Sequence, residues 1–322
     1  MRPYADDRIL QLADTWQKAG HEVALAVVIS TWGSSPRQPG SLMIIRDDGL
    51  IEGSVSGGCV EGAVIDAAMR AMKDTGTELL EFGVADETAW QVGLSCGGTI
   101  QIWVCSGASM EAGLLSSAAD ALKARRPISL ACRLAEGSLT SSGKSRQSNT
   151  ISEDGTVFLL SVKAQPRLFI IGAVHISQHL APMAEQTGFA VTIIDPRTTF
   201  ASEERFPGAD LIAEWPDIIL DQQPLDTECA MVTLTHDPKI DDAALRAALP
   251  HPLFFIACLG SRRTHAARLE RLKEAGFGEE DLARIHGPAG LPISAETPAE
   301  IAVSVLAQLI AARRGALEST VR

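Results

Sequence analysis

The residues best suited to chemistry in the first half of the chain are two cysteines that lie beside Gly-Gly pairs. Cys59 follows one pair in SGGCVEG, and Cys96 precedes another in LSCGGT. A predicted helix begins directly after Cys59, and the positive end of a helix dipole favours a thiolate. A thiolate can attack an electrophile, carry sulfur or ligate a soft metal. A cysteine in a tight turn can also simply fill a small space. The glycines of these turns are candidate contacts to a bound group: Gly57, Gly58, Gly97 and Gly98.

A turn-rich segment, TWGSSPRQPG, precedes the Cys59 loop and adds groups that can bind an anion. Its prolines restrict the backbone, while Ser34, Ser35 and Arg37 offer hydrogen-bond donors. If the strands bring both Gly-Gly turns to one sheet edge, Cys59 and Cys96 share a pocket with Arg37. The alternative is that these glycines and prolines serve only the turns.

The other four of the six cysteines lie in strand-like apolar runs, and we expect them to fill the core. They are Cys105, Cys132, Cys229 and Cys258. The chain has no C-x-x-C pair, which argues against a zinc ribbon and against a redox dithiol.

The second half contains a turn typical of nucleotide-binding folds, in IIGAVHIS. Gly172 and Ala173 end a predicted strand, His175 opens a helix, and Asp195 ends the next strand, where such folds place the acid that binds ribose. Val174 stands where the fingerprint has its second glycine, so its side chain opposes close approach of a pyrophosphate, and NAD(P) binding is doubtful. Gly172 and Asp195 can equally be a strand end and a turn cap, and His175 a structural residue.

A second candidate anion site is the sequence CLGSRRTH. Here a buried strand runs through Gly260 and Ser261 into a helix that begins with Arg262 and Arg263. Free N–H groups at a helix start, together with guanidinium charge, suit a phosphate. The alternative is an ordinary helix start with two surface arginines.

Two different element patterns divide the chain. Residues 1–165 mix helices with strands that look partly antiparallel, including a hairpin at Asp47-Asp48-Gly49, so we expect a mixed α/β domain. Residues 166–322 alternate short apolar strands with helices, which predicts a Rossmann-like, doubly wound parallel sheet. The polar stretch 136–155 predicts a long loop or hairpin. Near the end, Thr297, Pro298 and Glu300 form a capping-box pattern.

Composition narrows the class of protein. The net charge is −12 at pH 7, which gives no overall field for nucleic acid or an anionic membrane. The N-terminal sequence lacks a signal-peptide pattern, and the apolar run 301–312 is too short to span a bilayer. We therefore expect a cytoplasmic protein that has no membrane span and binds no nucleic acid.

Six ordered motifs across both halves resemble the XdhC/CoxI family. They are the segment from TWGSSPRQPG to SVSGGCVEGAV, then GLSCGGTIQIWV, IIGAVHIS with the following VTIIDPRTTF, LTHDPKIDDAAL, GSRRTHAARLERL, and ARIHGPAGLPIS with its helix. The resemblance implies an accessory protein, more an assembly factor than a metabolic enzyme. Such a protein binds molybdenum cofactor of the molybdopterin type, and supports its sulfuration and insertion into a xanthine dehydrogenase-type hydroxylase.

The resemblance also implies partners: the apo-hydroxylase, a cysteine desulfurase, and further copies of the chain in a homo-oligomer, expected as a homodimer. Many relatives carry Gly-Ala-Gly-His at the Rossmann turn, whereas this chain has Val174 at the third position. Two other functions stay open. One is an NAD(P)-dependent oxidoreductase that uses the Rossmann domain, and the other is a cofactor-free docking adaptor.

Overall fold

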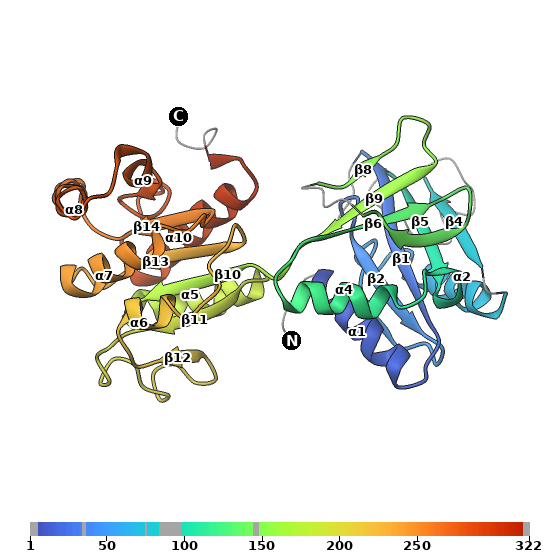
Figure 1. Cartoon of the computed structure of the whole chain (residues 1–322), viewed down its shortest axis with the longest axis horizontal. Helices are drawn as coiled ribbons and strands as arrows, with labels where there is room; N and C mark the ends of the chain where they lie inside the picture. Colours follow the sequence, from blue (N-terminus) through green and yellow to red (C-terminus); the bar gives the residue numbers. More distant parts are fainter. Residues whose placement is uncertain (1–5, 34–36, 75, 84–97, 144–147, 318–322) are drawn as a thin grey trace. The chain divides into compact units, whose positions relative to one another are not determined.

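The chain folds into two compact units that join between Ala164 and Gln165. A computed structural model describes residues 6–33, 37–74, 76–83, 98–143 and 148–317. Each unit has its own buried apolar clusters, two in the N-terminal unit and two in the C-terminal unit. Figure 1 labels the elements of both units where there is room.

The N-terminal unit is built on a five-stranded antiparallel sheet in the order β3-β2-β1-β5-β4. Its strands are β1 (Val23–Trp32), β2 (Leu42–Arg46), β3 (Ile51–Gly53), β4 (Thr77–Phe82) and β5 (Thr99–Ser106). A four-stranded antiparallel sheet, in the order β7-β6-β9-β8, comprises β6 (Ile128–Arg133), β7 (Ser138–Ser141), β8 (Thr150–Ile151) and β9 (Val157–Val162). The helices are α1 (Asp6–Lys18), α2 (Glu61–Lys73) and α4 (Leu114–Lys123), with a 3-10 turn at Gly107–Ser109.

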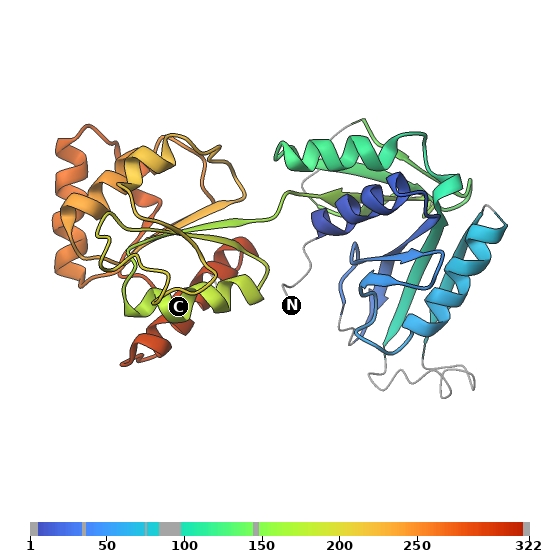
Figure 2. The ribbon, with the colours of Figure 1, turned by 90° about the horizontal axis from the view of Figure 1, so that it is seen from below.

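The central strand β1 shows why this sheet is covered on both faces. Its side chains alternate between two cores, because successive residues of a strand point to opposite faces. Ala24 and Ala26 pack on the α2 side, whereas Leu25 and Val27 join the cluster that contains α1, α4 and the four-stranded sheet. Figure 2 shows α1 and α4 side by side and α2 on the opposite face of the five-stranded sheet.

The C-terminal unit is a parallel six-stranded sheet in the order β12-β11-β10-β13-β14-β15. Its strands are β10 (Arg167–Ile171), β11 (Ala190–Ile194), β12 (Asp210–Ile212), β13 (Cys229–Thr233), β14 (Phe255–Cys258) and β15 (Ile285–His286). Numbered within the unit, this order is 3-2-1-4-5-6, the Rossmann order. The strand order reverses between β10 and β13, and ligands of such folds bind beyond the carboxyl ends of the strands at that point.

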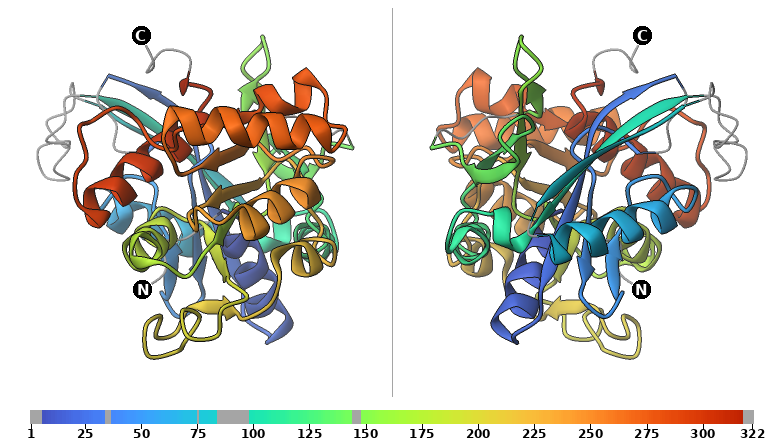
Figure 3. Two further views of the ribbon diagram at one scale, coloured as in Figure 1. Left: turned by 90° about the vertical axis from the view of Figure 1, so that its left-hand side faces the viewer. Right: turned by 90° about the vertical axis from the view of Figure 1, so that its right-hand side faces the viewer.

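Helices cover both faces of the parallel sheet (Figure 3). They are α5 (His175–Gln186), α6 (Pro216–Leu220), α7 (Pro238–Ala248), α8 (Arg262–Glu274), α9 (Glu279–Ala283) and α10 (Pro298–Arg313). One core lies under α5 and α10, and the other lies under α6, α7, α8 and α9. The apolar runs of these strands are buried on both sides, as a doubly wound sheet requires.

The mixed α/β fold class and the C-terminal parallel Rossmann sheet are therefore confirmed. The polar stretch 136–155 contains β7 and β8 rather than a plain loop. The capping box at the start of α10 forms as its pattern predicts: Thr297 accepts a hydrogen bond from the Glu300 amide, and Glu300 accepts one from the Thr297 amide. Among the described residues, no helix is long and apolar enough to cross a membrane.

Candidate functional site

Strand register places the predicted motif loops of the N-terminal unit at one edge of its five-stranded sheet. Trp32, the last residue of β1, pairs with Thr99, the first residue of β5. The amide of Ser54, directly after β3, donates to the carbonyl of Leu42, the first residue of β2. The segments that follow Trp32, follow Gly53 and precede Thr99 therefore start or end at this edge.

Glu61 holds the loop formed by residues 54–60. Its Oε1 accepts hydrogen bonds from Ser54 Oγ at 2.7 Å and from the amides of Ser56 and Gly57 at 3.0 and 3.1 Å. Its Oε2 accepts from the Gly58 amide at 2.9 Å and from Ser56 Oγ. Successive amides that converge on one carboxylate form an anion-binding nest. The amides of Gly57 and Gly58, predicted as cofactor contacts, are thus occupied by the chain's own carboxylate.

The charge of Glu61 is stabilised by these donors. Burial by itself raises the pKa of this carboxyl group, but the hydrogen bonds from Ser56 and Ser54 outweigh it and lower the pKa to about 2. The group is therefore ionised at neutral pH.

Cys59 lies in this loop, two residues before α2 begins at Glu61. The amides of Cys59 and Val60 both donate to Ser56 Oγ at 3.0 Å, so the backbone around the thiol is held in place. The Cys59 side chain is half-buried against the α2 core and forms no disulfide. Gly58 has φ +118°, and no atom outside its two chain neighbours lies within 4 Å of where its Cβ would be, so the loop is open at the residue before Cys59.

Arg37 lies against the same loop. Its Nε donates to the carbonyl oxygen of Ser54 at 3.0 Å. Gly98 is buried directly before β5. Three other predicted contacts, Ser34, Ser35 and Gly97, lie outside the described residues, and so does Cys96, the second predicted thiol.

Sequence reasoning missed two residues at this edge, Glu61 and Trp32. The side chain of Trp32 is 75% exposed at the end of β1, and an exposed aromatic face of this size can stack on a planar ligand. The sequence does contain a sign of the Glu61 contact. Glu61 is an acidic residue in the first helical turn after a Gly pair, and the side chain of such a residue often accepts hydrogen bonds from loop amides.

The remaining cysteines behave as predicted. Cys105, Cys132, Cys229 and Cys258 are completely buried. Burial raises the pKa of Cys105 to about 12 and that of Cys258 to about 11, so these thiols stay protonated.

In the C-terminal unit, the turn after β10 adopts the glycine-dependent conformation that the sequence predicts. Gly172 has φ +112°, and a Cβ there would lie 2.6 Å from Cγ2 of Thr235. Val174 has φ −97° and ψ 178°, an extended conformation that valine adopts without strain. The turn therefore needs glycine at its first position but accepts a side chain at its third.

Asp195 ends β11 as predicted, but its carboxylate is already occupied. It is completely buried, and it accepts from the Ala173 amide at 2.8 Å and from the Arg197 amide, Nε and Nη2 at 2.7 to 2.9 Å. Burial raises the pKa of Asp195, but the bonds from Arg197 and Ala173 outweigh it and lower the pKa below its ordinary value. A ribose hydroxyl approaching this acid would have to compete with Arg197, which sequence reasoning missed.

The other predicted residues of the C-terminal unit lie at helix starts. His175 is exposed at the start of α5, and its ring lies 5.3 Å from that of His179. Ser261 caps α8 by accepting from the Thr264 amide at 3.1 Å, while Arg262 and Arg263 are exposed on its first turn. Gly260 has φ +138° beside this cap. Since β10 and β14 are parallel, both helix starts lie at the carboxyl edge of the sheet.

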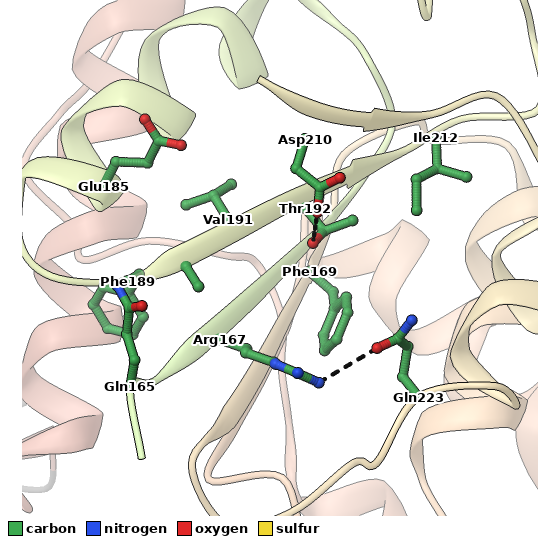
Figure 4. A pocket seen from close by; sticks show the side chains of 11 residues that line it. Gln165, Arg167, Phe169, Glu185, Phe189, Val191, Thr192, Asp210, Ile212 and Gln223 are labelled. Atoms are coloured by element: carbon green, nitrogen blue, oxygen red, sulfur yellow. Dashed lines mark hydrogen bonds between the residues drawn. The ribbon is translucent and has the colours of Figure 1, made fainter. Parts of the chain in front are cut away.

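A cavity of about 280 Å³ lies at the opposite edge, where β10, β11 and β12 begin (Figure 4). Polar groups that line it pair with one another: Arg167 Nη1 donates to Gln223 Oε1 at 3.3 Å, and Thr192 Oγ1 donates to Asp210 Oδ2 at 2.6 Å. This amino edge is not where Rossmann folds bind their ligands, and we assign no site to it.

The fold and the edge segments define a class of protein in which a mixed α/β unit with a Gly-Gly-Cys loop precedes a Rossmann domain. Two family models match the chain in that order. The XdhC and CoxI family model matches residues 16–83, and the XdhC Rossmann domain model matches residues 168–309. The chain therefore belongs to the XdhC/CoxI family.

Curated relatives are consistent with this membership. The chain is 28% identical to a probable xanthine dehydrogenase subunit of Bacillus subtilis, over 91% of this chain and 94% of that protein. It is also 28% identical to the molybdenum cofactor insertion chaperone PaoD of Escherichia coli, over 95% and 88% of the two chains. The uncharacterized protein YqeB of Escherichia coli is 27% identical, and the chain spans 44% of its length.

A solved structure shares the fold. A crystal structure from Bacillus halodurans, described as a xanthine dehydrogenase, superposes with a TM-score of 0.76 and covers 97% of this chain and 96% of its own. At 24% identity this likeness shows the fold alone.

Proposed function

We propose that this protein binds molybdenum cofactor and supports its sulfuration and insertion into a xanthine dehydrogenase-type hydroxylase. The observation that carries the proposal is the position of Cys59. The Cys59 side chain is half-buried, on a loop that Glu61 holds at the sheet edge where β1 ends and β5 begins, and the loop is open at the preceding Gly58. The names of PaoD and of the Bacillus subtilis relative support a maturation role.

The residues present fit this cofactor better than they fit a resident metal ion. Among the described residues, no group of three or more His, Cys, Asp or Glu side chains could hold a metal. Molybdenum cofactor brings its own dithiolene ligands and leaves only a further position for a soft protein donor. Cys59 would supply that donor, and the exposed ring of Trp32 would stack on the pterin.

A second role for Cys59 within this proposal is to carry sulfur. Its thiolate would attack the outer sulfur of a persulfide on a cysteine desulfurase. The S–S bond of that persulfide breaks, a new S–S bond forms on Cys59, and the desulfurase cysteine leaves as a thiolate. The desulfurase, the apo-hydroxylase and a homo-oligomeric state are parts of the proposal that come from family resemblance.

The test is to purify the protein from cells that make the complete cofactor and to measure molybdenum and oxidised pterin fluorescence in the same sample. We expect both, in equal amounts per chain. Absence of both, with the protein folded, would contradict the proposal.

The Rossmann strand order favours one alternative, a nicotinamide-dependent oxidoreductase. Val174 at the turn and the Asp195–Arg197 pair both work against it. Titration with NADH and NADPH, followed by nicotinamide fluorescence, decides this alternative, and we expect no saturable change.

A further inference from the structure

We propose that Glu61 is a positioning residue for Cys59, acting as a built-in anion that keeps the thiol-bearing loop in its binding conformation. The importance of Cys59 itself rests on the proposed function. The inference about Glu61 comes from the hydrogen bonds of the loop.

Several donors of the loop point at one carboxylate. Five hydrogen bonds converge on the Glu61 carboxylate, three on Oε1 and two on Oε2. The donors are the side chains of Ser54 and Ser56 and the amides of Ser56, Gly57 and Gly58. Without the Glu61 carboxylate, these five donors lose the acceptor that they share.

Ser56 transmits this arrangement to the cysteine. Its side chain is 2% exposed and donates to Glu61, and the same hydroxyl oxygen accepts from the amides of Cys59 and Val60. The carboxylate therefore fixes Ser56, and Ser56 fixes the backbone that carries the thiol. Glu61 has no direct contact with the space beside Gly58, so it orients Cys59 without occupying the ligand position.

The number of donors also explains why the negative charge of the Glu61 side chain matters in addition to its shape. A glutamine at this position could accept through its carbonyl oxygen, but its amide NH₂ would face the Gly58 amide or the Ser amides, donor against donor. Glutamine therefore leaves at least one side of the nest unsatisfied. Alanine removes both acceptor oxygens, so that of the three loop amides only that of Gly57 keeps a hydrogen bond among the described residues, to Ser54 Oγ at 2.9 Å. It preserves α2 because alanine is the best helix former.

The experiment compares the full-length protein with Glu61→Ala, Glu61→Gln and the control Asp66→Asn, which changes an exposed carboxylate on the same helix. Two readouts follow the loop: hydrogen exchange of the peptide that spans residues 54–64, and the rate at which N-ethylmaleimide modifies Cys59, resolved by peptide mass spectrometry. We expect Glu61→Ala to speed both by about tenfold or more, because several hydrogen bonds to a charged group are lost. Glu61→Gln should give a smaller increase, and Asp66→Asn none.

Adding a free carboxylate to the Glu61→Ala protein distinguishes an anion-binding nest from a general structural role of Glu61. Millimolar acetate should restore slow exchange and slow alkylation in Glu61→Ala, whereas acetamide or sodium chloride should not. Unchanged exchange and alkylation in Glu61→Ala, or equal rescue by acetamide, would overturn the inference.

The molybdenum content of each variant tests whether the loop matters for the proposed function. If the wild-type protein carries molybdenum, Glu61→Ala should carry several-fold less and Asp66→Asn the same amount; equal loading in Glu61→Ala would show that the positioning has no role. If the wild-type protein carries none, the proposed function fails, and the exchange and rescue data still decide the part played by Glu61.

Discussion

At the scale of single residues, two carboxylates have the largest effect on how the candidate sites work. Glu61 occupies the amides of Gly57 and Gly58, and Asp195 is occupied by Arg197. In both places, groups that typically bind a ligand are instead hydrogen-bonded to another residue of the same chain. We therefore propose that ligand binding at the N-terminal edge depends on the Cys59 side chain more than on the glycine amides.

The Asp195–Arg197 pair predicts a pH dependence of stability. The folded-state pKa of Asp195 lies below its ordinary value of 3.8, so the stabilisation is present above that value and is lost as the pH falls through the folded pKa. At about pH 6 we expect Asp195→Asn to lower the free energy of unfolding by about 2 kcal/mol, because hydrogen bonds to a charged group are lost.

Urea unfolding at about pH 6 and about pH 3 measures the difference between the two proteins at each pH. The difference should shrink at the lower pH. A difference that stays constant or grows on acidification would contradict the assignment of a lowered pKa to Asp195.

At the scale of elements, the turn between β10 and α5 depends on the absence of a side chain at Gly172. A Cβ there meets Cγ2 of Thr235 at 2.6 Å in addition to an unfavourable φ of +112°. Gly188 lies in the same unit with φ +96° and has nothing within 4 Å of its Cβ position. Both glycines thus have a positive φ that disfavours other residues, but only Gly172 also lacks room for a side chain.

Alanine substitution at each position separates the free-energy cost of the positive φ from the cost of the steric clash. Gly188→Ala should lower the free energy of unfolding by about 1 kcal/mol, and Gly172→Ala by about 3 kcal/mol, because only the second adds a clash. Thermal and urea unfolding provide the comparison. Equal losses for the two variants would show that the contact with Thr235 relaxes at no cost.

Much of the element pattern could be predicted from the sequence because the longer elements contain several periods of their hydrophobic repeat. The helices α2 and α8 and the strand β1 lie where apolar spacing predicts them. The elements α6, β12 and β15 are two to five residues long and too short to show a period. The Arg197 contact to Asp195 follows from a turn conformation after Pro196, which spacing alone does not reveal.

At the scale of the whole molecule, the two units have separate cores and separate candidate sites. The unit boundary lies between Ala164 and Gln165, and the sequence predicts it near residue 165. We propose that these units are independent folding domains. Each contains enough residues for a core of its own.

Expression of residues 4–164 and 165–322 as separate chains tests this independence. Each should unfold cooperatively, with a midpoint within a few degrees of one of the transitions of the full chain. A fragment that exposes its core, seen as strong binding of a hydrophobic dye, would contradict the division into domains.

We propose that Cys59 contacts molybdenum cofactor. The most direct measurement is the molybdenum content per chain of wild type, Cys59→Ser and Met69→Leu, each purified from cells that make the cofactor. Met69 carries an exposed sulfur on α2, so its replacement controls for the loss of a soft donor elsewhere in the same unit. We predict that Met69→Leu keeps the wild-type content and that Cys59→Ser loses most of it while remaining folded. Equal molybdenum in all three proteins would contradict the claim.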